Sequence, residues 1–373
     1  MTPCRTKILF LIPSLSPGGA ERVIVNLLRH LDKTRFIPVL AVVNLRSEVF
    51  LDDVPADVEL IDLQCTRVRF AVFKIIRLIW KLRPQVLFST LGYLNLLLAI
   101  LKPCCPKNIR YLCRESTILS EGIKNYSSSH YFDWAKTYRR FYKRFDRIIC
   151  QSTYMRDDLN SHFGIPMDKL VVIHNPVDTA RIRRLATELP ATEIPEHNAG
   201  GHGSVINLVS AGRMVKTKGF DLLIEALAIN GNPGVYLTLL GDGPLKEELQ
   251  SLAKQLGIEK QIRFVGFQKN PYAFIARADA YVLSSRYEGF PNVVLESLAC
   301  GTPVIATPAL GGSYEILNGV EGCLIAESLS AEGLAKALSS FAFGKRLPPE
   351  VVAPYAMERI VGLYEQQFSY NGA

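Results

Sequence analysis

Residues 285–306 read SRYEGFPNVVLESLACGTPVIA, and this segment constrains the fold more than any other part of the chain. The apolar residues 281–283 before it are typical of a buried strand. Pro291 suits the first position of a helix, because the N–H that proline lacks would be unpaired there. We expect this helix to close at Gly301, after which residues 303–306 supply the next strand. The segment therefore predicts one βαβ unit of a parallel sheet.

Two glutamates lie on either side of the start of this predicted helix. We expect Glu288 in the loop at the carboxyl end of the first strand and Glu296 about one turn inside the helix, so that both can face one crevice. The helix start suits a phosphate, which carboxylates alone would repel. A nucleotide sugar resolves this conflict, because its sugar hydroxyls can donate to Glu288 and its ribose hydroxyls to Glu296. A surface glutamate on an amphipathic helix is the alternative, and the surrounding glycines and proline weigh against it.

The same segment resembles the E-x7-E signature of retaining glycosyltransferases of family 4. Other motifs of that family follow in the expected order along almost the whole chain, and five motifs in order are far more specific than any one of them. Besides the E-x7-E segment, the four motifs are Gly18-Gly19-Ala20-Glu21, His174-Asn175-Pro176-Val177-Asp178, the loop that begins at Gly212-Arg213, and Gly311-Gly312-Ser313-Tyr314-Glu315. The resemblance implies an α/β protein with the GT-B fold, in which two Rossmann-like, doubly wound parallel-sheet domains face a central cleft.

Strand-length apolar segments alternate with helix-length segments in both halves of the chain, which independently predicts two parallel-sheet domains. The expected strands are residues 7–12, 37–43, 58–63, 85–88, 109–113, 147–150, 170–173, 205–210, 235–240, 262–265, 280–283, 303–306 and 323–325. We place the first domain at 1–188, a linker rich in Pro and Gly at 189–204, and the second domain at 205–353. The resemblance implies that the first domain binds the acceptor, that the second binds the nucleotide sugar, and that a C-terminal helix in 354–373 crosses back to the first.

The composition is consistent with a cytoplasmic enzyme. The chain has 373 residues, of which 48% are hydrophobic, and this is enough for two cores. No signal peptide is visible, and the longest apolar stretch, residues 94–101, is too short to span a bilayer. The eight cysteines include no C-x-x-C pair, so we expect reduced thiols rather than a metal site or a disulfide framework.

The loop after the first strand of the second domain is basic. Ligands of doubly wound sheets bind at the carboxyl ends of the strands, and there Arg213 and Lys218 can neutralise a departing diphosphate beside Gly212. A solvated basic loop is the alternative, and Lys216 ranks below the other two cations. By resemblance, Phe267 lies where the family binds the nucleotide base, with a core-closing phenylalanine as an equal alternative.

The resemblance extends the site to further residues. Around the helix start it implies donor contacts from Gly289, Phe290, Pro291, Asn292 and Val293. In the first domain, Gly18 and Gly19 form a turn without side chains that suits a diphosphate or the acceptor, unless it is only a tight turn. Many family members carry Glu-His after the strand at 109–113, whereas this chain has Glu115 followed by Ser116. We carry over Glu115 as a catalytic residue and assign no role to His174.

The mechanism follows from these residues. No Asp-x-Asp motif occurs, so we expect no metal at the diphosphate and no other cofactor. Cationic side chains and a helix dipole replace the metal, which makes the predicted enzyme metal-independent. Retention, which the resemblance implies, places acceptor attack on the face from which the diphosphate leaves. The leaving phosphate then accepts the proton, and Glu288, Arg213 and Lys218 orient and stabilise the reacting groups.

The positive charge is concentrated in the first half of the chain. Residues 1–178 hold 26 Lys and Arg against 16 Asp and Glu, whereas 179–373 hold 17 against 19. Six basic residues and no acidic one lie in 67–83, among large apolar side chains, and six against one lie in 134–147. Such helices bind anionic membranes, which predicts a peripheral protein on the inner face of the cell membrane. A core-packed helix with a solvated basic face is the alternative, and no nucleic-acid-binding module accompanies the charge.

The resemblance implies a UDP-sugar donor, a transferred hexose or N-acetylhexosamine, and a glycan or polyprenyl-diphosphate-linked acceptor in the synthesis of lipopolysaccharide or a related surface glycan. A nucleotide-sugar epimerase or a sugar phosphorylase on the same fold is the rival interpretation. A non-catalytic nucleotide-sugar-binding protein is another. A dehydrogenase is disfavoured, because neither Gly18-Gly19 nor Gly241-Asp242-Gly243 completes the dinucleotide fingerprint.

Overall fold

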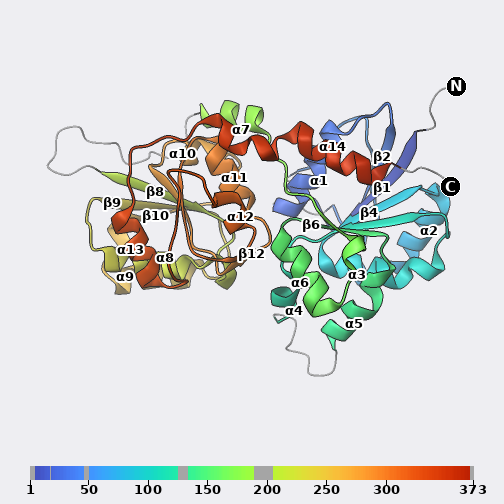
Figure 1. The fold of residues 1–373 in the computed structure, drawn as a ribbon, viewed down its shortest axis with the longest axis horizontal. Helices are drawn as coiled ribbons and strands as arrows, with labels where there is room; N and C mark the ends of the chain where they lie inside the picture. Colours follow the sequence, from blue (N-terminus) through green and yellow to red (C-terminus); the bar gives the residue numbers. More distant parts are fainter. Residues whose placement is uncertain (1–4, 17, 46–49, 125–132, 189–204, 370–373) are drawn as a thin grey trace. The chain divides into compact units, whose positions relative to one another are not determined.

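The structure is a computed structural model, and it describes residues 5–16, 18–45, 50–124, 133–188 and 205–369. The chain divides into two compact units, one of residues 1–176 with 357–373 and the other of residues 177–356 (Figure 1). Each unit has a parallel sheet covered by helices on both faces, so the predicted α/β class with two Rossmann-like domains is confirmed.

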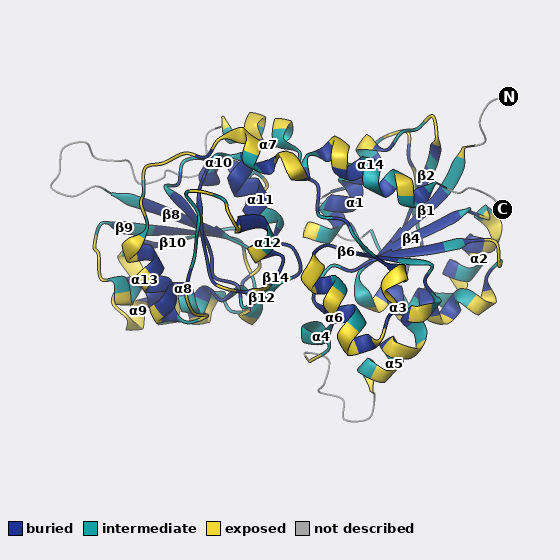
Figure 2. Cartoon of the chain, viewed as in Figure 1, coloured by how far each residue is buried: buried dark blue, intermediate teal, exposed yellow. Residues whose placement is uncertain are grey.

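The first unit is built on a seven-stranded sheet in the order β3-β2-β1-β4-β5-β6-β7. Its strands are apolar along nearly their whole length, because both faces of the sheet are covered (Figure 2). All pairs between them are parallel, and Ile8 lies opposite Pro38 on one side and Val86 on the other. The strands are β1 (Thr6–Ile12), β2 (Phe36–Val42), β3 (Glu59–Asp62), β4 (Val86–Thr90), β5 (Arg110–Arg114), β6 (Arg147–Cys150) and β7 (Leu170–Val172).

The C-terminal helix α14 (Met357–Phe368) packs on α1 and completes the core of the first unit, which confirms that it returns there (Figure 1). The ring of Phe368 lies 5.2 Å from that of Phe88 and 5.6 Å from that of Phe10, both edge to face. The other helices of this unit are α1 (Gly19–His30), α2 (Val72–Leu82), α3 (Gly92–Leu101), α4 (Leu119–Lys124), α5 (Trp134–Phe141) and α6 (Thr153–Phe163).

The second unit is built on a six-stranded sheet in the order β10-β9-β8-β11-β13-β15. Alternate residues of its strands enter two separate cores, one on each face. Its strands are β8 (Ile206–Ala211), β9 (Val235–Leu240), β10 (Ile262–Gly266), β11 (Ala280–Leu283), β13 (Val304–Ala306) and β15 (Leu324–Ile325). Its helices are α7 (Thr179–Ala186), α8 (Phe220–Asn230), α9 (Lys246–Gln255), α10 (Tyr272–Ile275), α11 (Asn292–Ala299), α12 (Ser313–Leu317) and α13 (Ala331–Ser340).

The structure differs from the sequence expectations in three places. Residues 177–188, which we expected in the first domain, belong to the second unit, because α7 packs on α10 and α11 and buries Ile182 in their core. Pro291 caps α11 from outside instead of opening it. A short parallel pair, β12 (Tyr287–Glu288) and β14 (Leu310–Gly311), was not expected. The predicted linker at 189–204 lies outside the described residues.

None of the described helices is long and apolar enough to cross a membrane.

Candidate functional site

The order of the strands in the second sheet reverses between β8 and β11, and doubly wound sheets bind ligands beside the carboxyl ends of strands at such a reversal. β8 ends at Ala211 and β11 at Leu283. The Tyr281 hydroxyl joins these ends, because it donates to the Ala211 carbonyl and accepts from the Ala211 N–H, each at 3.1 Å. Burial raises the pKa of Tyr281, and the carboxylates of Glu288 and Glu296 raise it further. Both predicted glutamates therefore lie near this reversal.

Glu288 and Lys218 form an ion pair at this edge of the sheet. Lys218 Nζ lies 2.6 Å from Glu288 Oε1, which also accepts a hydrogen bond of 2.6 Å from the Ser285 hydroxyl. The Glu288 side chain keeps 13% of its surface exposed and that of Lys218 keeps 28%, so a ligand can reach both. Within the described residues, Glu288 Oε2 accepts no hydrogen bond. That oxygen can accept one from a ligand hydroxyl.

Lys218 is held in place by the loop that follows β8. Its 3₁₀ turn η5 (Lys216–Lys218) ends at Gly219, whose φ of +61° is left-handed. A Cβ added at Gly219 would overlap the carbonyl oxygen of Ser284, so only glycine lets the loop approach the end of β11 this closely. The Ser284 hydroxyl donates to the Lys218 carbonyl at 2.9 Å. These contacts with the segment after β11 fix the position of the Lys218 ammonium.

A second charged cluster braces the same loop. Arg286 donates two hydrogen bonds to Asp221, at 2.7 and 2.8 Å, and Lys216 donates one at 2.7 Å. Burial opposes the negative charge of Asp221, but these bonds outweigh it and lower the pKa of Asp221 to about 2. Lys216 is thus bound to Asp221, whereas Lys218 is bound to Glu288.

Gly212, a predicted donor contact, lies where the loops after β8 and β9 meet. Its N–H donates to the Leu240 carbonyl at 2.9 Å. Gly241 has a φ of +128°, and a Cβ there would overlap the Gly212 carbonyl oxygen, so the two backbones touch directly. A loop surface without side chains lets a phosphate approach the backbone closely.

The start of α11 offers backbone groups to an anion. Asn292 and Val293 are half-buried in its first turn, directly after Pro291, where the helix dipole places partial positive charge. Glu296 is the fifth residue of α11 and is only 5% exposed. The predicted position of Glu296 about one turn inside the helix is confirmed.

Phe290 lies in the core rather than at the surface. Its ring packs 5.8 Å from the ring of Tyr355, and the residue is 5% exposed. The neighbouring Gly289 carbonyl accepts a hydrogen bond of 3.0 Å from Gly312 N–H in the loop after β14. The Phe290 ring therefore supports this loop and does not face a ligand, which leaves only its backbone as a candidate donor contact.

Arg213 and Phe267 are both exposed, Phe267 at 54%. No described residue pairs with the Arg213 guanidinium. Phe267 follows the last residue of β10. The alternative that it closes the core is therefore wrong, and its ring is free to stack on a planar ligand group.

Glu115, predicted as catalytic, is fully buried in the first unit at 0% exposure. Its Oε1 accepts hydrogen bonds from the Tyr142 hydroxyl and, at 3.0 Å, from Asn95 Nδ2. Burial raises the pKa of Glu115 to about 7, although these two bonds oppose the shift. A carboxylate without surface exposure cannot touch a substrate here. The predicted catalytic contact does not fit this burial, and the bonds of Glu115 instead join the end of β5 to α3 and to the turn after α5. A polar residue after a strand can point inward as well as outward.

Arg114 is buried beside Glu115. Its Nη2 donates to Asn175 Oδ1 at 2.5 Å, so it ties the end of β5 to the loop after β7. Burial lowers the pKa of Arg114, while Tyr364 on α14 and the charge of Glu21 raise it. The Glu21 carboxylate packs against Gly18, directly before Gly19 at the start of α1. The Gly18-Gly19 turn therefore lies against the buried carboxylate of Glu21, which was not among the predicted site residues.

The two basic segments of the first unit differ in exposure. In residues 67–83, the 3₁₀ turn η1 (Val68–Phe70) leads into α2, which buries Ile75 and Ile79 and exposes Phe73 at 85% and Trp80 at 49%. In residues 134–147, α5 buries Tyr138 and carries its basic residues on the outside. Both helices thus pack on the core, and the first also presents aromatic rings to the surroundings.

Sequence reasoning missed several residues that hold the site together. Ser285 opens the E-x7-E segment, Tyr281 lies in the strand before it, and Gly219 closes the loop that begins at Gly212-Arg213, but none of them had an assigned role. Two features of the sequence could have drawn attention to them: Gly219 directly follows a basic loop, and Ser285 lies three residues before Glu288. Neither feature reveals which distant backbone or side chain the residue contacts. Within the described ranges, no cluster of His, Cys, Asp or Glu side chains is arranged to hold a metal ion.

Two family models match the chain. The model described as "Glycosyltransferase Family 4" matches residues 17–181, and that described as "Glycosyl transferases group 1" matches residues 199–348. Among solved structures, Anabaena Alr3699/HepE in complex with UDP and glucose has a TM-score of 0.74 at 19% identity, covering 97% of this chain and 99% of that one. WaaG, a glycosyltransferase involved in lipopolysaccharide biosynthesis, has a TM-score of 0.67 at 16% identity, covering 96% and 95%.

Curated relatives are more similar in sequence over a shorter length. The lipopolysaccharide core biosynthesis glycosyltransferase LpsE of Rhizobium meliloti is 39% identical over 160 residues, which are 43% of this chain and 46% of LpsE. An N-acetylgalactosaminyltransferase of Campylobacter jejuni, named for a diphospho-undecaprenol-linked acceptor, is 33% identical over 186 residues, 50% of this chain and 48% of that protein. The chain thus spans about half the length of these relatives. With its two family matches and its two Rossmann-like units, it belongs to the family 4 type of GT-B glycosyltransferases.

Proposed function

We propose that this chain transfers a hexose or an N-acetylhexosamine from a UDP-sugar to a lipid-linked or oligosaccharide acceptor, with retention, in the synthesis of a cell-surface polysaccharide or glycoconjugate. The observation that carries the proposal is the Lys218–Glu288 ion pair at the strand reversal of the second sheet. The names of the relatives from Rhizobium meliloti and Campylobacter jejuni support the acceptor class. The UDP in the HepE structure supports the donor.

The second unit would bind the donor. Glu288 Oε2 accepts a sugar hydroxyl, and Glu296 accepts the ribose hydroxyls. The Lys218 ammonium has three donors, so it can keep its bond to Glu288 and also bind a phosphate oxygen. Arg213 adds a second positive charge, and the dipole of α11 adds a partial one.

The chemical step then needs no basic side chain. The bond between the anomeric carbon and the diphosphate oxygen breaks, while a new bond forms from the acceptor oxygen on the same face. The acceptor proton passes to the departing phosphate, whose charge Lys218 and Arg213 stabilise as it develops. Glu288 orients the sugar for this attack.

The first unit would bind the acceptor at the inner face of the cell membrane. The exposed rings of Phe70, Phe73 and Trp80 and the six basic residues of 67–83 support contact with an anionic bilayer, together with the basic residues of 134–147. Flotation of the protein with phosphatidylglycerol vesicles at low salt measures this contact. Recovery of all the protein in the dense fraction would contradict it.

Transfer from UDP-sugars labelled in the sugar tests the reaction, with a sugar on a short-chain prenyl diphosphate as acceptor. We expect Lys218→Ala and Glu288→Gln to lower kcat/KM by about 100-fold or more. The matched control is Glu321→Gln, since Glu321 has 96% of its side chain exposed. Near-normal transfer by Glu288→Gln would contradict its role, and an epimerised or phosphorolysed product would favour the rival activities.

A further inference from the structure

The first unit contains a pocket of about 730 Å³, a volume that suits a small-molecule ligand. Its walls come from the loops after β1, β2 and β3 and from helices α3 and α5. It therefore lies at the carboxyl edge of the sheet, where the strand order reverses between β1 and β4. None of the site residues predicted from the sequence lines it.

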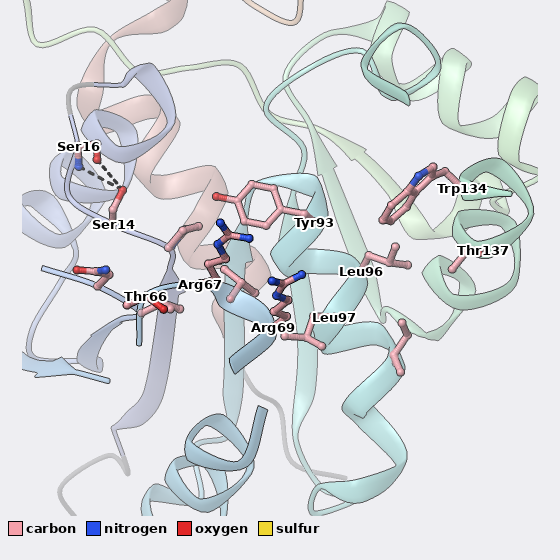
Figure 3. A pocket seen from close by; sticks show the side chains of 15 residues that line it. Ser14, Ser16, Thr66, Arg67, Arg69, Tyr93, Leu96, Leu97, Trp134 and Thr137 are labelled. Atoms are coloured by element: carbon pink, nitrogen blue, oxygen red, sulfur yellow. Dashed lines mark hydrogen bonds between the residues drawn. The ribbon is translucent and has the colours of Figure 1, made fainter. Parts of the chain in front are cut away.

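The lining of the pocket changes character from one end to the other (Figure 3). Ser14 and Ser16, joined by a hydrogen bond of 2.9 Å between their hydroxyls, lie at one end. The guanidinium groups of Arg67 and Arg69 lie in the middle, beside the Tyr93 ring. Leu97 lies beside Arg69, and the far end contains Leu96 and Trp134 together with Thr137. Ile100, one helical turn after Leu96 on α3, also lines the pocket. A matching ligand is polar at one end, anionic in the middle and aliphatic at the other.

The two arginines are available to an anion. Among the residues that the structure describes, no carboxylate pairs with Arg67 or Arg69, and both are exposed. The Arg69 guanidinium lies 4.9 Å from the centroid of the Phe70 ring, which helps to hold it in place. Two guanidinium groups two residues apart, beside apolar walls, suit the charge of a diphosphate.

The apolar end of the pocket adjoins exposed hydrophobic side chains. Ile100 and Tyr93 line the pocket and are 39% and 44% exposed, and Phe70 directly follows Arg69 with 58% exposure. The Trp80 indole donates to the Cys104 carbonyl at 3.0 Å, so this half-exposed ring lies beside the end of α3. An aliphatic chain that leaves the pocket meets an apolar patch, which is a surface suited to a membrane.

We propose that this pocket is the acceptor site and that it takes a sugar linked through a diphosphate to an aliphatic chain. Arg67 and Arg69 bind the diphosphate, Leu97, Ile100 and Trp134 contact the first part of the chain, and the Ser14 end faces the sugar. This assignment rests on the proposed sugar transfer. A chain that moves from a bilayer into an apolar pocket exchanges one apolar environment for another, so the arginines supply most of the affinity and the apolar wall supplies orientation.

The test uses the full chain with Trp80→Phe, which leaves Trp134 as the one tryptophan. Geranylgeranyl diphosphate is titrated while Trp134 fluorescence is followed. We expect saturable binding that Arg67→Ala/Arg69→Ala weakens at least about 10-fold. The control is Lys254→Ala/Lys260→Ala, which removes the same charge from exposed positions.

A second variant tests the apolar end. Ile100→Gln should weaken binding of geranylgeranyl diphosphate but leave binding of isopentenyl diphosphate unchanged, because the short probe does not reach that wall. Equal binding by the double arginine variant and the lysine control would overturn the proposal. A second result would also overturn it: the unaltered protein does not bind geranylgeranyl diphosphate, and the double arginine variant loses binding to phosphatidylglycerol vesicles. The arginines would then be membrane contacts.

The outcomes also separate this inference from the proposed function. Binding of the prenyl diphosphate at Arg67 and Arg69 without sugar transfer from any UDP-sugar would remove the proposed function and leave an amphiphile-binding pocket. If the double arginine variant and the unaltered protein transfer sugar to the same acceptor equally well, the proposed function stands and the pocket assignment is refuted.

Discussion

The buried carboxylate of Glu115 should make the stability of the first unit depend on pH, and Glu115→Gln should remove this dependence. Glu115 has 0% exposure, and within the described residues its Oε2 has no hydrogen-bond partner. Water solvates the ionised form in the unfolded chain but not in this interior, so folding favours the protonated form.

The magnitude follows from the rise of the pKa of Glu115 from 4.5 to about 7. The folded state holds the proton more tightly than the unfolded chain, so the stability from this group is complete below about pH 4.5 and is lost as pH rises through about 7. At about 1.4 kcal/mol per pH unit, the loss approaches about 3 kcal/mol at pH 8.5. Glutamine keeps the shape of the protonated carboxyl group and does not ionise.

Both tryptophans, Trp80 and Trp134, belong to the first unit, so their fluorescence reports unfolding of the part that contains Glu115. Urea unfolding at pH 5 and pH 8.5 gives the free energy of unfolding for each variant. We expect the difference between the two pH values to be about 3 kcal/mol smaller in Glu115→Gln than in the unaltered protein. Glu59→Gln, at an exposed position of the same unit, should behave like the unaltered protein.

An identical pH difference in Glu115→Gln and the unaltered protein would contradict this prediction. It would mean that Glu115 ionises in the folded state as it does in the unfolded chain. A larger difference in the variant would show that folding stabilises the charged form of Glu115, contrary to its burial.

Three further predictions concern the second unit. Gly219→Ala should lower its free energy of unfolding by about 2 kcal/mol or more, measured in urea by circular dichroism, because the left-handed backbone and the Ser284 carbonyl leave no room for Cβ. Asp221→Asn should lower the free energy of unfolding by about 1 to 2 kcal/mol at pH 7 and leave it unchanged below pH 2. The pKa of Asp221 is lowered to about 2 in the folded state, so its contribution to stability is present above about pH 4 and is lost as pH falls through about 2. Sugar transfer should survive EDTA, and loss of transfer that magnesium restores would contradict the metal-independent mechanism.

The sheets were predictable because their strands are short apolar runs buried on both faces. Strands β6, β9 and β11 have the predicted bounds, and each of the other predicted strands overlaps an observed one. The pair β12 and β14 was missed because two-residue strands leave no periodic pattern, and each is defined by its partner. The predicted end of the first domain at residue 188 was wrong for a related reason, because residues 177–188 belong to the second unit. The apolar face of α7 shows that the helix is packed, but not which core it packs on.

The fold class, the family and the placement of Glu288 and Glu296 after β11 could be predicted, because apolar periodicity and glycine positions are local properties of the chain. Which side chains meet depends on how distant segments pack together, and this could not be predicted. Lys218 reaches Glu288 across 70 residues of sequence, and Arg114 reaches Asn175 across 61. The burial of Glu115 and the pocket around Arg67 were likewise invisible in the sequence. A polar residue after a strand can point inward or outward, and only packing against distant elements fixes which.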